Sequence, residues 1–323
     1  MLAGVTAWIL TDGKVGDEAQ CLAVGEALGL RAELRHVNPG PPFSWVMPFG
    51  PIDPREAPEQ PRSPIRPPFP DILIASGRRA IAYVRRTKRA SGGRTFTVIL
   101  KDPRTGATAA DFIWVPEHDR LRGPNVLATL TAPHQLAPQR LAAARAAPSH
   151  HLADLPSPRV AVLVGGDSRH HRFTTADAAT FLARLSDLAQ SGASLMVTAS
   201  RRTPAHLTEG LSRLMADSHG FLWDGEGDNP LLAMLALADT VVATADSTNM
   251  VGEAASTGVP VLVFEPTGGN ARISRFLTCL REAGIVHSFT GRLAGSAYQP
   301  LDSTLTIAEA IERAFRAHCQ ALA

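Results

Sequence analysis

The chain has little cysteine, little net charge and no long apolar run, and each shortage excludes a class of protein. Its three cysteines, Cys21, Cys279 and Cys319, form no C-x-x-C pair, which excludes a disulfide framework and a cysteine-built zinc site. No stretch approaches the roughly 18 apolar residues of a membrane span, and the first residues lack the basic region of a signal peptide. These features predict a cytoplasmic protein, with peripheral contact at the inner membrane as the remaining membrane option.

The composition is that of a folded protein. Hydrophobic residues make up 45% of the 323 residues and the formal net charge is +2, which excludes disorder as the overall state. Residues 1–155 carry 19 Lys and Arg against 14 Asp and Glu, whereas residues 156–323 carry 13 against 16. This slight asymmetry favours an anionic partner for the first half, but no nucleic acid is indicated. The length favours two domains over one.

Short β-branched and apolar runs alternate with helical stretches along the chain. Strands are expected at 6–10, 71–75, 95–100, 112–115, 159–164, 194–199, 239–244 and 259–264, and helices at 17–28, 175–190, 230–238 and 249–257. This alternation is typical of parallel sheets built from βαβ units. The predicted fold class is therefore α/β, with two Rossmann-like, doubly wound parallel-sheet domains.

Prolines mark the junction between the two halves. Five of them interrupt the alanine-rich segment 132–158, which is the predicted hinge. The first domain is expected at 1–135 and the second at 156–302. The amphipathic segment 303–323 is expected to form a helix that caps one domain or bridges both.

A second proline-rich segment, 39–70, has twelve prolines in 32 positions, which excludes regular helix or sheet through most of it. One interpretation is a long surface connection. The other is an arm whose apolar residues contact a lipid or a partner protein. Those residues are Phe43, Trp45, Val46, Met47 and Phe49.

The turn after the first predicted strand is suited to anions. It contains Asp12, Gly13, Lys14 and Gly16, and it precedes a helix, so free N–H groups and the positive helix end lie beside it. The turn matches neither the dinucleotide fingerprint nor the P-loop. An ordinary connecting turn is the alternative interpretation.

Small and polar residues also follow two strands of the second half. They are Gly165, Gly166 and Ser168 after the strand at 159–164, and Ser200, Arg201 and Arg202 after the strand at 194–199. Guanidinium groups at such a place bind phosphate or carboxylate. The neighbouring His170 and His171 are expected to face solvent, as adjacent histidines on a loop commonly do. A Ser-His-Asp hydrolase is disfavoured, because no G-x-S-x-G nucleophile elbow accompanies them.

The most informative segment opens the helix expected at 249–257. Asp246, Ser247, Thr248 and Asn249 precede or begin this helix, and Glu253 lies one turn inside it. Such residues cap helices, and a cap alone is the simplest explanation. Five polar groups at the carboxyl edge of a sheet also suit the hydroxyls and phosphates of a nucleotide sugar.

These motifs carry a resemblance to known proteins. Segment 245–261, ADSTNMVGEAASTGVPV, is similar to the donor-nucleotide region of GT-B glycosyltransferases. The whole chain resembles the bacterial branch of the mitochondrial fission (elongated mitochondria) family. The segments that match, in the family's order, are WILTDGKVGDEAQ, PDILIASGRRA, LKDPR, PEHD, LVGGDS, ASRRTP, WDGEGDNP and the segment at 245–261.

The resemblance implies two domains facing across a cleft that binds a nucleotide-diphosphate sugar. In the second domain it implies that Glu253 holds the ribose, that Ser247, Thr248 and Asn249 meet the pyrophosphate, and that segment 221–226 with Trp223 contacts the base. Gly165, Gly166, Ser168, Ser200, Arg201, Arg202 and Asp246 would complete the donor site. In the first domain the residues facing a lipid-linked or soluble acceptor would be Gly13, Lys14, Gly16, Gln20, Arg78, Lys101, Asp102 and Arg104.

The resemblance implies a metal-independent glycosyltransferase, because no D-x-D follows a strand, and no cofactor beyond the donor. The base that would accept the acceptor's proton is not singled out, and Asp12, Asp17 and His118 are the candidates. An adaptor without catalytic activity stays open, because plant relatives are described as adaptors for a dynamin-like GTPase.

A nucleotide-sugar epimerase of the short-chain dehydrogenase type is disfavoured. It would need a Tyr-x-x-x-Lys motif, but Tyr83 has Lys88 at the fifth position and Tyr298 has no lysine after it.

Overall fold

The computed structural model describes residues 2, 4–148, 150–218 and 220–322. The chain divides into two compact units, which are described separately. The first unit comprises Met1–Gln135 and Asp302–Ala323, and the second comprises Leu136–Leu301.

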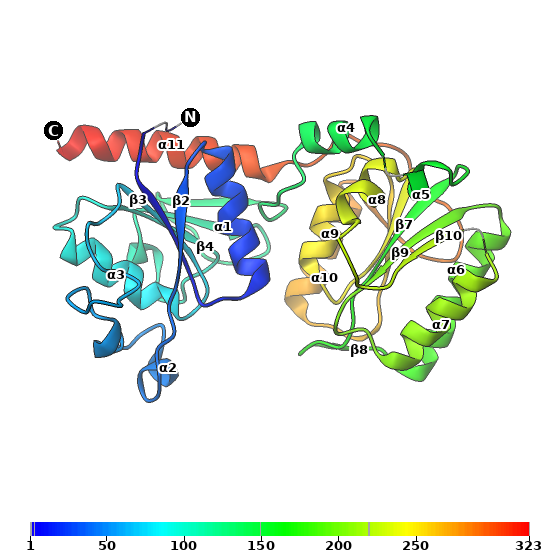
Figure 1. Ribbon diagram of the computed structural model, residues 1–323, viewed down its shortest axis with the longest axis horizontal. Coiled ribbons are helices and arrows are strands. Elements are labelled where there is room, and N and C mark those ends of the chain that lie inside the picture. Colours follow the sequence, from blue (N-terminus) through cyan, green and yellow to red (C-terminus); the bar gives the residue numbers. More distant parts are fainter. Residues whose placement is uncertain (1, 3, 149, 219, 323) are drawn as a thin grey trace. The chain divides into compact units, whose positions relative to one another are not determined.

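The first unit is built on a six-stranded parallel sheet with the strand order β2-β1-β3-β4-β5-β6 (Figure 1). The strands are β1 (Ala7–Thr11), β2 (Ala32–His36), β3 (Ile72–Ser76), β4 (Phe96–Leu100), β5 (Phe112–Pro116) and β6 (Val126–Thr129). The helices are α1 (Val15–Ala27), α2 (Phe43–Val46), α3 (Ala80–Ala90) and α11 (Ser303–Leu322), with short 3-10 turns at Pro54–Glu56 and Ala107–Ala109. The central strands β1, β3, β4 and β5 are buried along their whole length, as expected of a parallel sheet covered on both faces.

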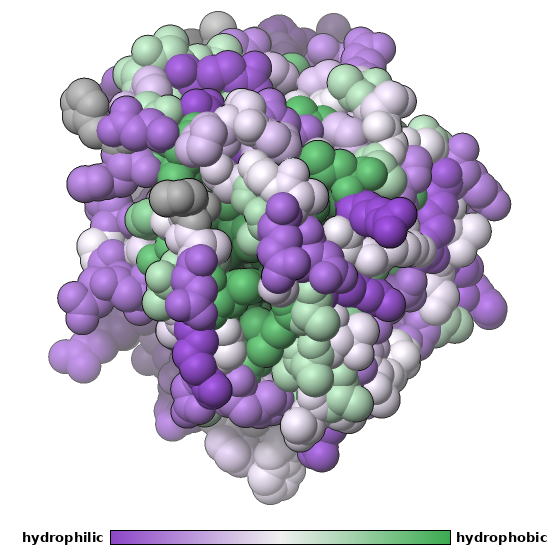
Figure 2. Space-filling model, turned by 90° about the vertical axis from the view of Figure 1, so that its right-hand side faces the viewer, coloured by the Kyte–Doolittle hydropathy of each residue, from purple (hydrophilic) through white to green (hydrophobic). Residues whose placement is uncertain are grey.

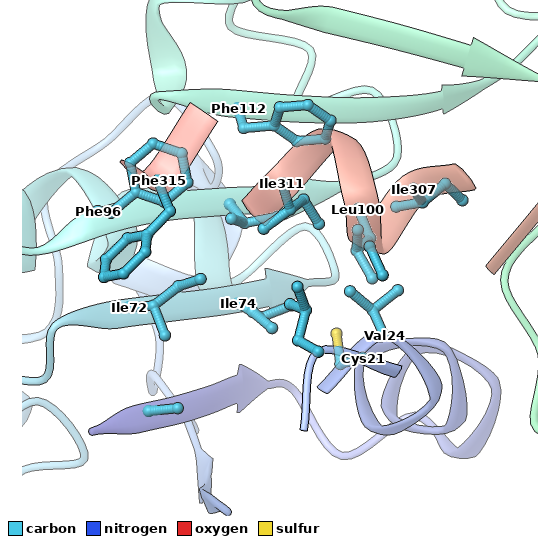
Figure 3. Close-up of a cluster of buried hydrophobic side chains, with 14 of the residues drawn as sticks. Cys21, Val24, Ile72, Ile74, Phe96, Leu100, Phe112, Ile307, Ile311 and Phe315 are labelled. Atoms are coloured by element: carbon cyan, nitrogen blue, oxygen red, sulfur yellow. The ribbon is translucent and has the colours of Figure 1, made fainter. Parts of the chain in front are cut away.

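One face of this sheet is covered by α1 and by α11 from the far end of the sequence (Figure 3). Ile307, Ile311 and Phe315 repeat at helical spacing and are buried against Phe96 and other strand residues. The ring centroids of Phe96 and Phe315 are 5.7 Å apart. The helix predicted at 303–323 is therefore part of the first unit.

The other face is covered by α3 and the proline-rich segment 39–70. Met47 and Ile65 from this segment are 2% and 0% exposed and join the same apolar cluster as Tyr83. The segment is therefore a connection between β2 and β3 that lies largely at the surface, with a few of its residues buried in the core. Of the five apolar residues expected to form a patch, Met47 is buried and Phe43 packs against the cluster, whereas Trp45, Val46 and Phe49 are exposed.

The second unit contains a six-stranded parallel sheet with the order β10-β9-β7-β11-β12-β14. The strands are β7 (Arg159–Val164), β9 (Ser194–Ala199), β10 (Gly220–Trp223), β11 (Thr240–Thr244), β12 (Val261–Phe264) and β14 (Val286–Ser288), with a small antiparallel pair, β8 (His171–Arg172) and β13 (Thr267–Gly268). The helices are α4 (Pro138–Ala146), α5 (His150–Ala153), α6 (Thr175–Gln190), α7 (Ala205–Ala216), α8 (Leu231–Leu237), α9 (Thr248–Ala255) and α10 (Ala271–Glu282).

Apolar side chains fix the layers of the second unit. Val160 and Val162 of β7 join a buried cluster with Phe181 of α6 and Leu207 of α7 on one face. On the other side, α8 contacts β7, and α9 contacts β11 and β12. Figure 2 faces the side where α6 and α7 lie, and it shows hydrophilic side chains around exposed apolar ones.

The eight expected strands are all present, with ends shifted by at most two residues. The strands β2, β6, β10 and β14 were not predicted. Residues 32–36 of β2 are exposed or half-buried and read AELRH, so no apolar run marks this edge strand. The segment 138–146 of the predicted hinge forms α4, which packs on α8 within the second unit.

Candidate functional site

The strand order of the second sheet identifies where a ligand would bind. With β7 as its first strand, the order corresponds to 3-2-1-4-5-6, in which the direction of winding reverses between β7 and β11. Open α/β sheets bind ligands outside the carboxyl ends of the two strands at this switch point. The residues there are Gly165 and Gly166 after β7, and Ala245 and Asp246 after β11.

Asp246 is the centre of a hydrogen-bond network at this switch point. Its side chain has 0% exposure, and its Oδ2 accepts hydrogen bonds from the Gly166 amide at 3.0 Å and the Arg202 guanidinium at 3.1 Å. Its Oδ1 accepts one from the Thr244 hydroxyl at 2.6 Å. The Thr244 Oγ1 in turn accepts a hydrogen bond from the Gly165 amide at 2.8 Å. The carboxylate therefore ties together the loops that follow β7, β9 and β11.

The two glycines are explained by this network. A Cβ atom at Gly165 would lie 2.2 Å from both carboxylate oxygens of Asp246, and one at Gly166 would lie 2.0 Å from the carbonyl oxygen of Arg202. No side chain fits at either position without movement of buried polar groups. The groups that approach these two glycines closely belong to the protein itself.

The two arginines have different surroundings. Arg202 donates to the Asp167 carbonyl at 3.0 Å as well as to Asp246, so its guanidinium holds the loops together. Arg201 is exposed and makes no hydrogen bond or ion pair with any residue that the structure describes. Arg201 is thus a guanidinium at this edge without a carboxylate partner among the described residues.

The two serines of these loops also bond locally. The Ser168 hydroxyl accepts a hydrogen bond from the His171 amide at 3.1 Å, and the Ser200 hydroxyl accepts one from the Arg202 amide at 3.1 Å. Both hydroxyls keep a proton that can be donated elsewhere.

His171 contradicts the expectation that both histidines face solvent. His170 is exposed, but His171 is only 3% exposed, because it belongs to β8, where alternate residues point inward. Burial lowers the pKa of His171, while Asp246 and Glu265 act in the opposite direction. Its buried Nδ1 has no hydrogen-bond partner among the described residues. In the sequence, the charged Arg172 stands between His171 and the apolar Phe173. This alternation, which matches the buried and exposed positions, is the signal that could have identified His171 as buried.

Helix α9 begins at the same edge. Its N-cap is Ser247, whose hydroxyl accepts a hydrogen bond from the Met250 amide at 3.4 Å, and Thr248 and Asn249 form the first turn. Glu253 lies one turn further on and is half-buried, and its carboxyl group has no hydrogen-bond or ion-pair partner in the part of the chain that the structure describes. Burial raises the pKa of Glu253 from 4.5 to about 7. A carboxyl group in this state gains from any ligand that donates hydrogen bonds to it.

Trp223 ends β10, which lies two strands away from β7 in the sheet. Its indole N–H donates to the Glu226 carbonyl at 2.8 Å, closing the loop 223–226. Trp223 is therefore at the same carboxyl edge but outside the Asp246 network.

In the first unit, the direction of winding reverses between β1 and β3, and Asp12 follows β1 there. Lys14 pairs with Asp12 Oδ2 at 2.7 Å, whereas Oδ1 of Asp12 is buried and accepts no hydrogen bond from the described residues. Gly77 follows β3 with φ +97°, and a Cβ atom there would lie 2.8 Å from that Oδ1. Gly77 was not predicted as a site residue, although it directly follows an expected strand.

A second ion pair at this edge joins Lys101, after β4, to Asp17 in the first turn of α1. Lys101 has φ +91°, a conformation that costs a non-glycine residue energy and that recurs at functional sites. Gln20 is buried one turn after Asp17, and Gly16 lies between the two ion pairs in sequence. The structure thus gathers Asp12, Gly13, Lys14, Asp17 and Lys101 at the carboxyl edge.

Arg78, Asp102 and Arg104 form hydrogen bonds outside this group. Arg78 donates to the carbonyls of Met47 at 3.0 Å and Ser44 at 3.3 Å, so it holds the proline-rich segment. Asp102 accepts a hydrogen bond from the Arg104 amide at 2.8 Å, which shapes the loop after β4. His118 lies after β5, next to β4 in the sheet, and is half-buried.

Two further properties of the described residues bear on the site. No three or more His, Cys, Asp and Glu side chains among them are grouped as metal ligands. None of the helices in the described part of the chain has the length and apolar character required to span a membrane.

Comparison with known proteins gives the context. The family described as "Mitochondrial fission ELM1" matches residues 15–315. The chain is 30% identical over 271 residues to a protein named "Mitochondrial fission protein ELM1" from Arabidopsis thaliana, and the match covers 76% of this chain. It spans 64% of the plant protein, which is less than two thirds of its length.

Solved structures show the same fold at low identity. A UDP-GlcNAc 2-epimerase from Neisseria meningitidis, bound to UDP-GlcNAc, is 12% identical with a TM-score of 0.53, and the match covers 95% of this chain and 91% of that one. A UDP-glucosyltransferase from Polygonum tinctorium is 12% identical with a TM-score of 0.53, with 99% and 95% covered. The fold is therefore of the GT-B type found in these nucleotide-sugar enzymes.

Proposed function

The chain belongs to the mitochondrial fission ELM1 family, and from that premise we propose that it binds a nucleotide-diphosphate sugar at the carboxyl edge of the second sheet and transfers the sugar to an acceptor. The observation that carries the proposal is Glu253, a half-buried carboxyl group without a partner among the described residues, one turn inside a helix at the switch point. Vicinal hydroxyls, such as those of a ribose, match a carboxylate with two free oxygens.

The diphosphate would lie at the N-terminus of α9. Free N–H groups of its first turn and the positive end of the helix dipole stabilise anions there. Ser247 and Thr248 can donate hydroxyl protons, and Arg201 supplies a positive charge without a carboxylate partner in the described chain. The same groups would stabilise the charge that develops on the diphosphate as it leaves.

Asp246 and Arg202 take a different role in this proposal from the one implied by the resemblance. Because they bond each other and the adjacent loops, they position Gly165, Gly166 and Arg201 rather than bind the donor.

The acceptor is proposed to bind at the carboxyl edge of the first sheet. Between Asp12 and Asp17 we favour Asp12 as the base, because it directly follows β1 at the switch point of the first sheet, whereas Asp17 is paired with Lys101. Asp12 would accept the proton of an acceptor hydroxyl bound at this edge. We also propose peripheral membrane contact by Trp45, Val46 and Phe49, which suits a lipid-linked acceptor.

An adaptor without catalytic activity is the second candidate. It is favoured by the hydrogen bonds of Gly166 and Arg202 to Asp246 and of Gly165 to Thr244, since such a network also serves the fold alone.

A thermal-shift screen separates the two candidates. The ligands are UDP-, GDP-, ADP-, dTDP- and CMP-sugars and the free diphosphates, tested on the wild type, Glu253→Ala and the matched control Glu282→Ala, whose side chain is exposed on the same unit. A ligand at a hundred times its Kd adds about 2.7 kcal/mol to the free energy of unfolding. A shift with one nucleotide that is lost only in Glu253→Ala supports donor binding, and no shift with any ligand supports the adaptor.

A further inference from the structure

A groove of about 810 Å³ lies in the first unit between α3 and the residues that follow α2. Phe49 to Ile52 form one side, α3 forms another, and Thr97 and residues 108–111 complete it. This volume is in the range of small-ligand sites. The groove belongs to neither carboxyl edge described above.

The charge of the groove is unbalanced. Four cations line it, Arg85, Arg86, Lys88 and Arg89, against the single carboxylate of Asp111. Lys88 pairs with Asp111 at 2.8 Å, and Arg86 pairs with Glu59 at 3.0 Å. Arg85 and Arg89 have no carboxylate partner among the described residues, and Arg89 is exposed. Two positive charges are therefore left for an anionic ligand.

Large apolar side chains are exposed on this groove and in α2, which precedes it in the sequence. Trp45 is 73% exposed and Phe49 is 70% exposed, and Phe49 itself lines the groove. Large apolar side chains exposed together on a protein surface are typical of sites that contact a membrane or another protein. In Figure 1, α2 lies at the lower end of the first unit, away from the sheet.

The aromatic side chains are held in place by the cations of α3 and the loop before it. Arg85 donates a hydrogen bond to the Pro48 carbonyl, directly before Phe49, and Arg78 donates to the carbonyls of Met47 and Ser44. Met47 is buried beneath them. The exposed rings thus project from a fixed turn, next to the unpaired positive charges.

We propose that this groove binds the phosphate headgroup of an anionic lipid while Trp45 and Phe49 enter the interfacial region of the bilayer. Anionic membrane surfaces attract Lys and Arg, and amphipathic rings favour the headgroup level. The inference rests on the peripheral contact proposed for α2, and it adds the headgroup site and the requirement for anionic lipid. It does not depend on nucleotide binding.

The test is flotation of the full chain with vesicles of phosphatidylcholine alone or mixed with phosphatidylglycerol. The wild type is expected to bind the mixed vesicles, with binding weakened by added salt. Arg89→Gln is expected to lower the partition coefficient about fivefold, the effect of one cation near an anionic surface. Arg313→Gln, which removes the same charge from α11 on the other face of the sheet, is expected to leave it unchanged.

A double variant, Trp45→Ser with Phe49→Ser, separates the two parts of the proposal. If it abolishes binding while Arg89→Gln behaves like Arg313→Gln, the α2 contact stands and the headgroup site is wrong. Equal binding to both kinds of vesicle would also overturn the lipid headgroup site, whereas release by soluble glycerol phosphate would support it. Absence of binding to any vesicle overturns both parts. The nucleotide screen is unaffected by each of these outcomes, and melting temperatures confirm that the variants fold.

Discussion

The carboxylate of Asp246 accepts a hydrogen bond from the guanidinium of Arg202 at 3.1 Å, although Asp246 is fully buried and the Arg202 side chain is 47% exposed. The pair joins the loop after β9 to the loop after β11, across the end of β7. Asp246 and Arg202, which the sequence suggested as ligand-binding residues, therefore stabilise the loops at the carboxyl edge of the sheet.

Removal of the Asp246 carboxylate is predicted to destabilise the second unit. Asp246→Ala leaves the amide of Gly166 and the hydroxyl of Thr244 without their acceptor, so the free energy of unfolding is expected to fall by about 3 kcal/mol. Urea denaturation measures this change. Asp217→Ala, at an exposed position of the same unit, serves as the control. A loss below about 1 kcal/mol would show that the network contributes little to the fold.

The two glycines Gly165 and Gly252 are predicted to respond to alanine in opposite directions. A Cβ at Gly165 meets the Asp246 oxygens at 2.2 Å, whereas one at Gly252, within α9, has no neighbour within 4 Å. Gly165→Ala is expected to cost about 2 kcal/mol or more through overpacking. Gly252→Ala is expected to stabilise the chain by about 0.5–1 kcal/mol, because alanine favours helix. Melting curves of the two variants test this prediction. Equal shifts in melting temperature would contradict the close contact described at Gly165.

Arg201 and Arg202 are predicted to differ when each is replaced by alanine. Arg201→Ala should weaken diphosphate binding roughly tenfold, the loss of one charge-assisted hydrogen bond, with little change in melting temperature. Arg202→Ala should lower the melting temperature, because Arg202 bonds to Asp246 and the Asp167 carbonyl. Calorimetric titration of a free diphosphate and of the nucleoside gives both affinities. If nucleoside affinity falls as much as diphosphate affinity in Arg201→Ala, Arg201 does not bind the phosphates.

Glu253 is predicted to make nucleotide binding depend on pH. In the free protein, burial raises the pKa of Glu253 to about 7, and hydroxyl groups that donate to the carboxylate favour its ionised form. Nucleotide affinity is therefore expected to be full above pH 7 and to fall as the pH drops below it. Glu253→Gln should bind more weakly and lose this dependence. A wild-type affinity that stays constant between pH 5 and 8 would exclude a role for the ionised carboxylate.

The Glu253 carboxyl group also makes the free energy of unfolding depend on pH, with a sign opposite to that for nucleotide affinity. Since the folded pKa lies above the ordinary value of 4.5, the folded protein holds its proton more tightly than the unfolded chain does. Its contribution to stability is full below about pH 4.5 and is lost as the pH rises through about 7. Glu253→Gln should reduce this loss, which denaturation at several pH values would show.

The fold followed from the sequence wherever apolar runs mark buried strands. The runs at 159–164 and 239–244 identified β7 and β11, but β2 was missed because the edge position needs no apolar run. In the proline-rich segment the burial of Met47 and Ile65 was not predicted, because it depends on packing against residues distant in the sequence. Likewise, the sequence predicted that Asp246 lies at the carboxyl edge of the sheet. It could not show that Arg202 and Gly166 donate hydrogen bonds to the Asp246 carboxylate.

The most direct test of the central claim is a crystal structure of the protein with the nucleotide that the thermal-shift screen selects. We predict that the diphosphate lies at the first turn of α9 beside Arg201, and that the ribose hydroxyls donate hydrogen bonds to the Glu253 carboxylate. A nucleotide bound elsewhere, or a ribose that leaves Glu253 without a hydrogen bond, would contradict the proposal.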